Sequence, residues 1–163
     1  MSKRIWWFLT FVFAMGPLAA ELALEYHLPN GGVGWKVANE ISNKNKVVYI
    51  PENTTILNAK EVFSVHVNYF PMDINNRDLL EEGIKTNYPN KEVSINFLEK
   101  APQTVLYEWS VKDADQEKVH GWTRGFVNPQ VTVFLNYQTE QMNEVNNVSS
   151  AWIKTLKEAK FEK

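Results

Sequence analysis

Residues 92–138, EVSINFLEKAPQTVLYEWSVKDADQEKVHGWTRGFVNPQVTVFLNYQ, decide the fold. This stretch contains apolar-rich segments that are separated by turn residues: Glu92–Leu98, Val105–Lys112, Lys118–Val127 and Gln130–Gln138. The connections between them are too short for the crossovers that parallel strands require. The sequence therefore predicts an antiparallel meander of four strands over this region.

The segment before the meander, Glu61–Phe70, alternates in polarity. Apolar and aromatic side chains occupy every second position and polar ones lie between them, which is typical of a strand with one buried face. The first set is Phe63, Val65, Val67 and Tyr69, and the second is Ser64, His66 and Asn68. We expect a half-buried strand here.

Nearer the N-terminus, turn residues divide the chain into short strands. Leu24–Leu28 reads as a strand that stops at Pro29-Asn30-Gly31-Gly32. Trp35–Ile41 and Lys46–Ile50 form a predicted hairpin across Ser42-Asn43-Lys44-Asn45.

Two segments have helical spacing instead. Over Asn75–Tyr88 the apolar residues Leu80, Ile84 and Tyr88 recur every four positions, and Asn75 can act as the N-cap. From Met142 onward a second apolar stripe appears, formed by Val145, Val148, Trp152, Leu156 and Ala159. The chain is therefore an α+β protein, in which helices cover an antiparallel sheet.

Residues 1–20 look like a cleavable secretory signal peptide. Lys3 and Arg4 precede the apolar stretch Ile5–Met15, and Leu18-Ala19-Ala20 supplies small residues for cleavage before Glu21. We expect residues 21–163 to form a single domain that is secreted or periplasmic, with no stable membrane insertion after cleavage. The alternative is an uncleaved N-terminal anchor, although the apolar stretch is short for a membrane span.

The net charge and the amino-acid composition exclude some kinds of partner and some kinds of chemistry. Without residues 1–20 the chain has 15 Lys and Arg against 19 Asp and Glu, a formal charge of −4, so nucleic acid is excluded as a partner. The chain contains no Cys, which removes disulfides and thiol chemistry. A domain of this size can be held together by burial alone.

Catalytic and metal-binding motifs are absent from the sequence. His27, His66 and His120 lie far apart and in no metal-ligand pattern, and no Ser lies in a G-x-S-x-G elbow. We therefore expect no catalytic residues, no metal and no cofactor. A hydrolase with a dispersed site stays open as an alternative, and its mark would be a cleft with His66 or His120 beside a carboxylate.

The strongest candidate for a binding surface is His120-Gly121-Trp122-Thr123-Arg124-Gly125-Phe126. Alternation places His120, Trp122, Arg124 and Phe126 on one face of a strand. Aromatic residues and Arg are frequent interface anchors, so this face, if exposed, would bind a ligand or partner. The competing interpretation places Trp122 and Phe126 in the core beneath a helix, with Arg124 reaching out to solvent.

The order of elements resembles the PsbP-like fold group. The residues that carry this resemblance are Gly34-Trp35 at the start of a strand, Val48-Tyr49-Ile50-Pro51-Glu52 before a loop, and Asn58-Ala59-Lys60-Glu61 before the next strand. That group includes lumenal extrinsic subunits of photosystem II, a Ran-binding accessory factor of nuclear import and small exported bacterial proteins. The resemblance spans residues 24–161 and implies an α/β/α sandwich.

The same resemblance implies a function in binding or assembly without catalysis. We expect an exported protein that binds a protein or a small ligand, as a secreted factor of a host-associated bacterium. The alternative in the same class is a periplasmic envelope or assembly accessory protein, which would stay with the cells. No metal ligands of the group can be transferred to residues of this chain.

Overall fold

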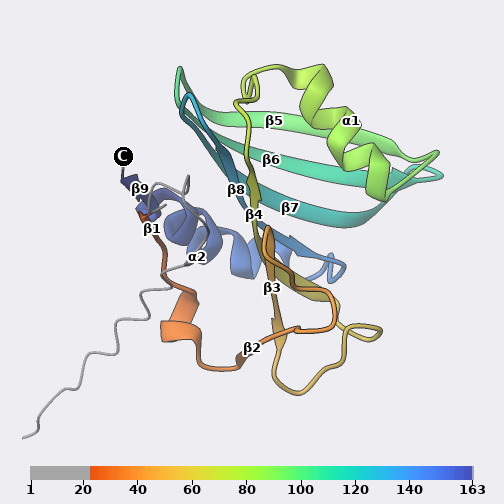
Figure 1. Ribbon diagram of the computed structural model, residues 1–163. Helices are drawn as coiled ribbons and strands as arrows, with labels where there is room; N and C mark the ends of the chain where they lie inside the picture. The colour runs from red at the N-terminus through yellow and green to blue at the C-terminus, as the bar shows by residue number, and fades with distance from the viewer. Residues whose placement is uncertain (1–22, 163) are drawn as a thin grey trace, which may run out of the picture.

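The computed structural model describes residues 23–162, and the expected signal peptide at residues 1–20 lies outside them. An antiparallel sheet of seven strands forms the centre of the fold, with one helix on each face (Figure 1). This is the α/β/α arrangement predicted from the sequence. Within residues 23–162, no helix is long and apolar enough to cross a membrane.

The sheet has the strand order β2-β3-β4-β8-β7-β6-β5. Its strands are β2 (Trp35–Val37), β3 (Lys46–Pro51), β4 (Glu61–Asn68), β5 (Glu92–Ala101), β6 (Thr104–Asp113), β7 (Gln116–Val127) and β8 (Thr132–Thr139). Strands β5 to β8 are adjacent in the order of the chain, so they form the predicted meander. The predicted hairpin between β2 and β3 is also present, although β2 is shorter than expected.

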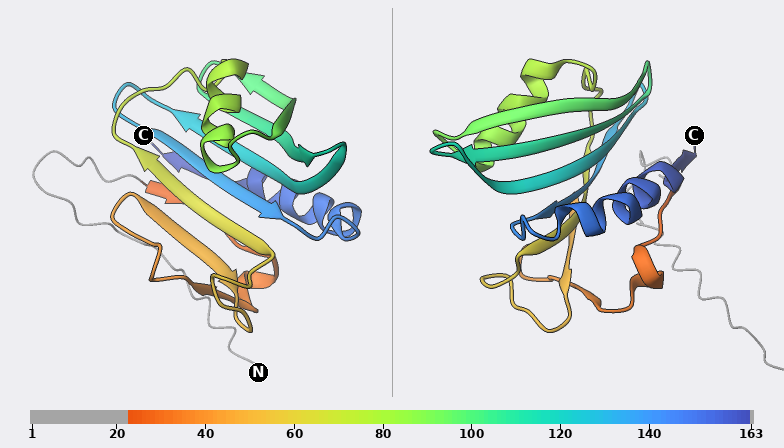
Figure 2. Two further views of the ribbon diagram at one scale, coloured as in Figure 1. Left: turned by 90° about the vertical axis from the view of Figure 1, so that its right-hand side faces the viewer. Right: turned by 180° about the vertical axis from the view of Figure 1, so that it is seen from behind.

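The two helices lie on opposite faces of the sheet (Figure 2). Helix α1 (Arg77–Asn87) packs on β5, and α2 (Val145–Glu158) packs on β7 and β8. The prediction of Asn75 as the N-cap of the first helix was wrong, because the side chain of the next residue, Asn76, accepts a hydrogen bond from the backbone nitrogen of Leu79. The carboxamide of Asn75 instead donates to the Ala101 carbonyl oxygen at 2.8 Å.

The core on the α2 face is aromatic. The Trp152 ring of α2 stacks on Tyr137 at a centroid distance of 4.0 Å and on Phe63 at 5.4 Å, with interplanar angles of 13° and 21°. Trp122, which is fully buried, stacks on the other side of this group against Tyr137 at 6.0 Å. Large stacked rings bury much apolar area and fix the position of α2.

The core on the α1 face is built from alternate residues of the same strands. Leu80 and Ile84 of α1 pack with Val105, Tyr107 and Trp109 of β6. The central strands therefore contribute side chains to a core on each side, and both faces of the alternation are buried there.

A separate pair of short strands joins the two ends of the described chain. Strand β1 (Ala23–Glu25) pairs with β9 (Lys160–Glu162), and Leu24 and Phe161 pack against the α2-face core. The sequence predicted a longer strand over Leu24–Leu28, but β1 ends at Glu25. Pro29–Gly32, where that strand was expected to stop, forms a 3-10 turn. Strand β9 was not predicted.

Candidate functional site

The structure places the four predicted site residues together on the α2 face of β7. Trp122 has no exposed surface and Phe126 is 6% exposed, and both belong to the core with Leu156 of α2. The two aromatic residues therefore occupy the positions that the competing interpretation assigned to them. His120 and Arg124 have side chains that are each 12% exposed, at the margin of this core.

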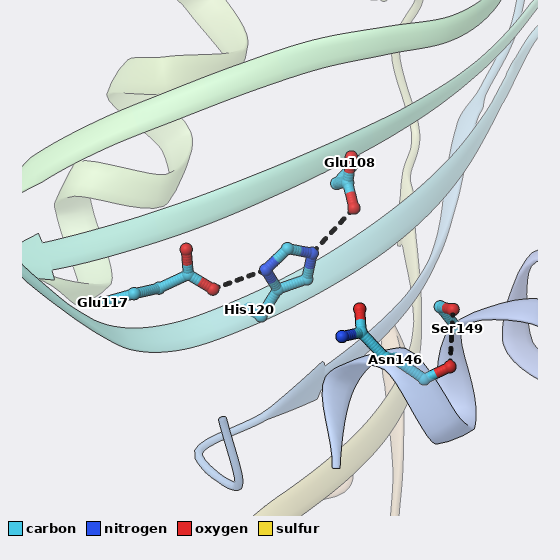
Figure 3. Close-up of polar contacts among 5 residues, drawn as sticks. All are labelled: Glu108, Glu117, His120, Asn146 and Ser149. Carbon is cyan, nitrogen blue, oxygen red and sulfur yellow. Dashed lines mark hydrogen bonds and ion pairs between the residues drawn. The ribbon is translucent and has the colours of Figure 1, made fainter. Parts of the chain in front are cut away.

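His120 lies between two carboxylates (Figure 3). Its Nδ1 atom is 2.6 Å from Oε1 of Glu117, and its Nε2 atom is 2.8 Å from Oε1 of Glu108. The imidazole also packs against the Trp122 ring at a centroid distance of 4.7 Å. Both ring nitrogens and one ring face of His120 are thus engaged.

A β-bulge explains how Glu117 reaches His120. Residues three apart in a regular strand point to opposite faces. In β7, however, Val119 pairs with Val111 while Glu117 pairs with Lys112, so Lys118 is an extra residue in the ladder. The bulge brings Glu117 to the face that carries His120.

This geometry bears on the hydrolase alternative. A neutral imidazole has one N–H, so the ring can donate to both carboxylates only as an imidazolium. A general base must present a free ring nitrogen to the hydroxyl that it deprotonates. Ser110 lies opposite His120 in the β6–β7 ladder, but both ring nitrogens of His120 are occupied by carboxylates. The arrangement suits an ion-paired structural group better than a catalytic base.

The other histidines lie elsewhere. His66 lies on the α1 face of β4, where partial burial of the imidazole and then the positive charge of Lys46 lower its pKa. His27 follows β1 and lies 3.5 Å from the carboxylate of Glu25. Among residues 23–162, no group of three or more His, Cys, Asp or Glu side chains has an arrangement that could hold a metal ion.

Arg124 takes part in a second charged cluster. Its Nη1 atom is 2.7 Å from Oε2 of Glu99 in β5, and Oε1 of Glu99 is 2.9 Å from Nζ of Lys157 in α2. Hydrogen bonds from these two cations hold the pKa of Glu99 below its ordinary value, and Lys157 has the larger effect. Glu99 therefore links the sheet to α2, a role that sequence reasoning did not find.

The surface beside His120 is polar and partly open. Glu108 and Glu117 are 33% and 35% exposed, and only Oε1 of each contacts the imidazole, so each Oε2 atom is available to another group. In the view from behind in Figure 2, α2 crosses the sheet below β5 and β6 and leaves this part of the face without a helix. We call this area the His120 surface, which consists of Ser94, Asn96, Glu108, Lys112, Glu117 and His120.

The first turn of α2 borders the His120 surface. Figure 3 shows the side chain of Asn146 pointing from α2 toward the strand that carries His120. Asn146 is exposed, and Ser149 Oγ donates to its backbone oxygen at 3.3 Å.

Comparison with known proteins identifies the class of fold. The chain has a PsbP-like fold, as its element order suggested. It is similar to the solution structure of cyanobacterial PsbP (CyanoP) from Synechocystis sp. PCC 6803, with a TM-score of 0.56 and 15% sequence identity over 93% of this chain and 99% of that one. No family model and no curated protein matches the sequence. At this identity the likeness concerns the fold alone.

Proposed function

We propose that this protein is exported and binds a partner protein through the His120 surface, without catalysing a reaction. Residues 1–20 support export, since they have the basic start, apolar stretch and small residues of a secretory signal. The PsbP-like fold does not decide the function, because one fold hosts many. The argument for binding therefore rests on the site.

The observation that carries the proposal is the His120 ion cluster. Its two carboxylates hold the imidazole in place, while the side chains of Glu108 and Glu117 remain 33% and 35% exposed on an uncovered part of the sheet. A single imidazole cannot neutralise both carboxylates, so the cluster keeps a net negative charge, which favours a basic side chain of a partner. Exposed acceptors that are already held in place lose little entropy on binding.

Site-specific photo-crosslinking tests the binding surface. A photoreactive amino acid at Asn96, on the His120 surface, should crosslink to a defined partner in the producing cells or their medium. The matched control carries the same residue at Glu82, an exposed position of α1 on the opposite face. The partner should be lost when Glu108→Gln and Glu117→Gln are introduced together. Equal crosslinking from both positions, or crosslinking that the double variant leaves unchanged, would refute the proposal.

Fractionation tests export. The chain expressed with its native N-terminus should yield a product that begins near Glu21 in the periplasm or the medium. Recovery in the medium would favour a secreted factor, and retention with the cells would favour an envelope or assembly accessory protein. An intact Met1 in the membrane fraction would contradict export with cleavage.

A further inference from the structure

A second hollow lies on the α1 face, away from the His120 surface. It is found where the C-terminal end of α1 meets the start of β5, the β6–β7 hairpin and the end of β8, and its volume is about 400 Å³. Small-molecule pockets range from roughly 300 to 1,000 Å³. The hollow, which we call the α1-end hollow, therefore suits a small ligand.

The floor and one wall of the hollow are apolar. Val111 and Val119 are paired in the β6–β7 ladder, are 2% and 4% exposed, and line the hollow. Tyr88, which caps α1, forms a wall. Its hydroxyl accepts a hydrogen bond of 2.9 Å from Nε2 of Gln138, and its ring lies 6.3 Å from that of Trp109, so the wall is held in place. An aliphatic side chain of a ligand can pack against this floor and wall.

The rim on the β5 and β6 side is cationic. Lys91 Nζ is 2.7 Å from Oδ2 of Asp113, and Lys118 lies on the same side, with its ammonium bonded to the neutral amide of Gln116. Lys91 lowers the pKa of Asp113, and the positive charge of Lys118 adds to this effect. This part of the lining thus has two ammonium groups and one carboxylate, so it has a net positive charge and favours a carboxylate ligand.

The rim at the end of β8 is anionic. Within the described part of the chain, the carboxylate of Glu140 has no hydrogen-bond or ion-pair partner, and its backbone nitrogen is fixed to the Lys60 carbonyl at 2.8 Å. Its charge contributes, after burial, to raising the pKa of the Tyr88 hydroxyl, which places the carboxylate near that wall. This rim favours an ammonium group.

The order of strands separates the two rims. Glu140 follows β8 and Lys91 precedes β5, and β7 and β6 lie between them with Val119 and Val111. Neighbouring strands are about 4.8 Å apart, so the ends of this row are roughly 10–14 Å apart before the side chains reach inward. Two or three residues of an extended peptide, at about 3.3–3.6 Å each, span roughly 7–11 Å, which suits the shorter distance that is left once the side chains of Lys91 and Glu140 reach inward.

We propose that the α1-end hollow binds a short apolar peptide of two or three residues with free termini. The peptide carboxylate pairs with Lys91 and Lys118, its ammonium pairs with Glu140, and its apolar side chain contacts Val111 and Val119. This site is independent of the His120 surface, which lies on the other face of the sheet.

Titration of the labelled protein, residues 21–163, with the tripeptide Ala-Leu-Ala tests the proposal by amide NMR shifts and calorimetry. Saturable shifts should appear at Val111, Val119 and Glu140. N-acetylation or C-amidation of the peptide should each weaken binding about fivefold, the upper range for an exposed ion pair. Free leucine, which cannot span the rims, should bind more weakly still.

Matched variants locate the contacts. Lys118→Gln should weaken the free tripeptide about fivefold and leave the C-amidated peptide unaffected. Lys44→Gln, a change of the same charge in the exposed β2–β3 turn, should have no effect. The proposal is overturned if the tripeptide produces no saturable shifts, if the blocked peptides bind equally well, or if the shifts lie outside the hollow. None of these outcomes bears on crosslinking from Asn96.

Discussion

The indole of Trp109 lies directly over Gly121 of the neighbouring strand. A Cβ atom on Gly121 would stand 2.4 Å from the ring atoms Cε2 and Cζ2, closer than real carbon contacts. Trp109 Nε1 donates to Thr123 Oγ1 and to Asn136 Oδ1, both at 3.1 Å, so the ring is tied to the sheet beneath it. The absence of a side chain at Gly121 is therefore what lets Trp109 lie flat.

Gly121→Ala should destabilise the protein by about 2–3 kcal/mol, because the ring must leave its hydrogen bonds to make room. The loss should appear as a lower urea midpoint with an unchanged slope. The control is Gly83→Ala in α1, where a Cβ meets nothing within 4 Å, and it should stabilise by up to about 1 kcal/mol. Wild-type stability of Gly121→Ala would show that the ring moves freely.

His120→Gln should cost about 1 kcal/mol, since it removes the group that separates the carboxylates of Glu108 and Glu117. Glu108→Gln in the same chain relieves the repulsion, so the double variant should be more stable than His120→Gln alone. A double-mutant cycle from urea unfolding measures this coupling. Additive losses would mean that the cluster contributes no pairing energy.

Glu99→Gln should destabilise the protein by about 1 kcal/mol at pH 7, because Arg124 and Lys157 lose their shared carboxylate. The pKa of Glu99 is lowered in the folded protein, so this contribution is present above the unfolded pKa of about 4.5 and is lost as the pH falls through the folded value. The stability difference between wild type and variant should shrink toward pH 3. A constant difference would contradict the ion-pair explanation.

The stability of the protein should fall on mild acidification through His66. Its pKa is lowered in the folded state by burial and then by Lys46, so the unfolded chain takes up a proton more readily. Stability should therefore decrease as the pH drops below about 6.5, the unfolded value. Urea unfolding of wild type and His66→Gln between pH 7.5 and pH 5.5 isolates this effect, and parallel curves would exclude it.

Ala114→Asn should stabilise the β6–β7 hairpin. Ala114 and Asp115 have φ values of +47° and +66°, the two positive angles of a type I′ turn. Asn tolerates this conformation better than Ala, so a gain of about 0.5–1 kcal/mol is expected as a higher Tm. Ala151→Asn, on the exposed side of α2, should instead lower the Tm, since Asn is the poorer helix former.

Much of the fold follows from patterns within single segments. Alternation in Glu61–Phe70 predicted β4, and the short connections between apolar segments predicted the meander. Helical spacing located both helices within a few residues. The N-cap was misplaced by one position because Asn75 and Asn76 are adjacent residues of the same type, and only the backbone geometry distinguishes them.

The candidate site depends on helix packing and on β-bulges, which the alternation of apolar and polar residues in the sequence does not reveal. Alternation in β7 separated the two faces without showing that a helix covers Trp122 and Phe126. The bulges beside Lys118 and between Phe97 and Glu99 turn the carboxylates of Glu117 and Glu99 toward the α2 face. No residue pattern in the sequence identifies these bulges. Glu117, a partner of His120, and Glu99, the partner of Arg124, were missed for this reason.

The pairing of β1 with β9 also has a topological meaning. The described chain leaves one strand of this ribbon, passes through the whole sheet and returns antiparallel to its starting point, with Leu24 beside Phe161. A tight turn of a few residues would close the circuit without moving either strand. With its two ends joined, the chain would tolerate new ends at another exposed position. The loop at Leu57, a residue that is 92% exposed, is such a position.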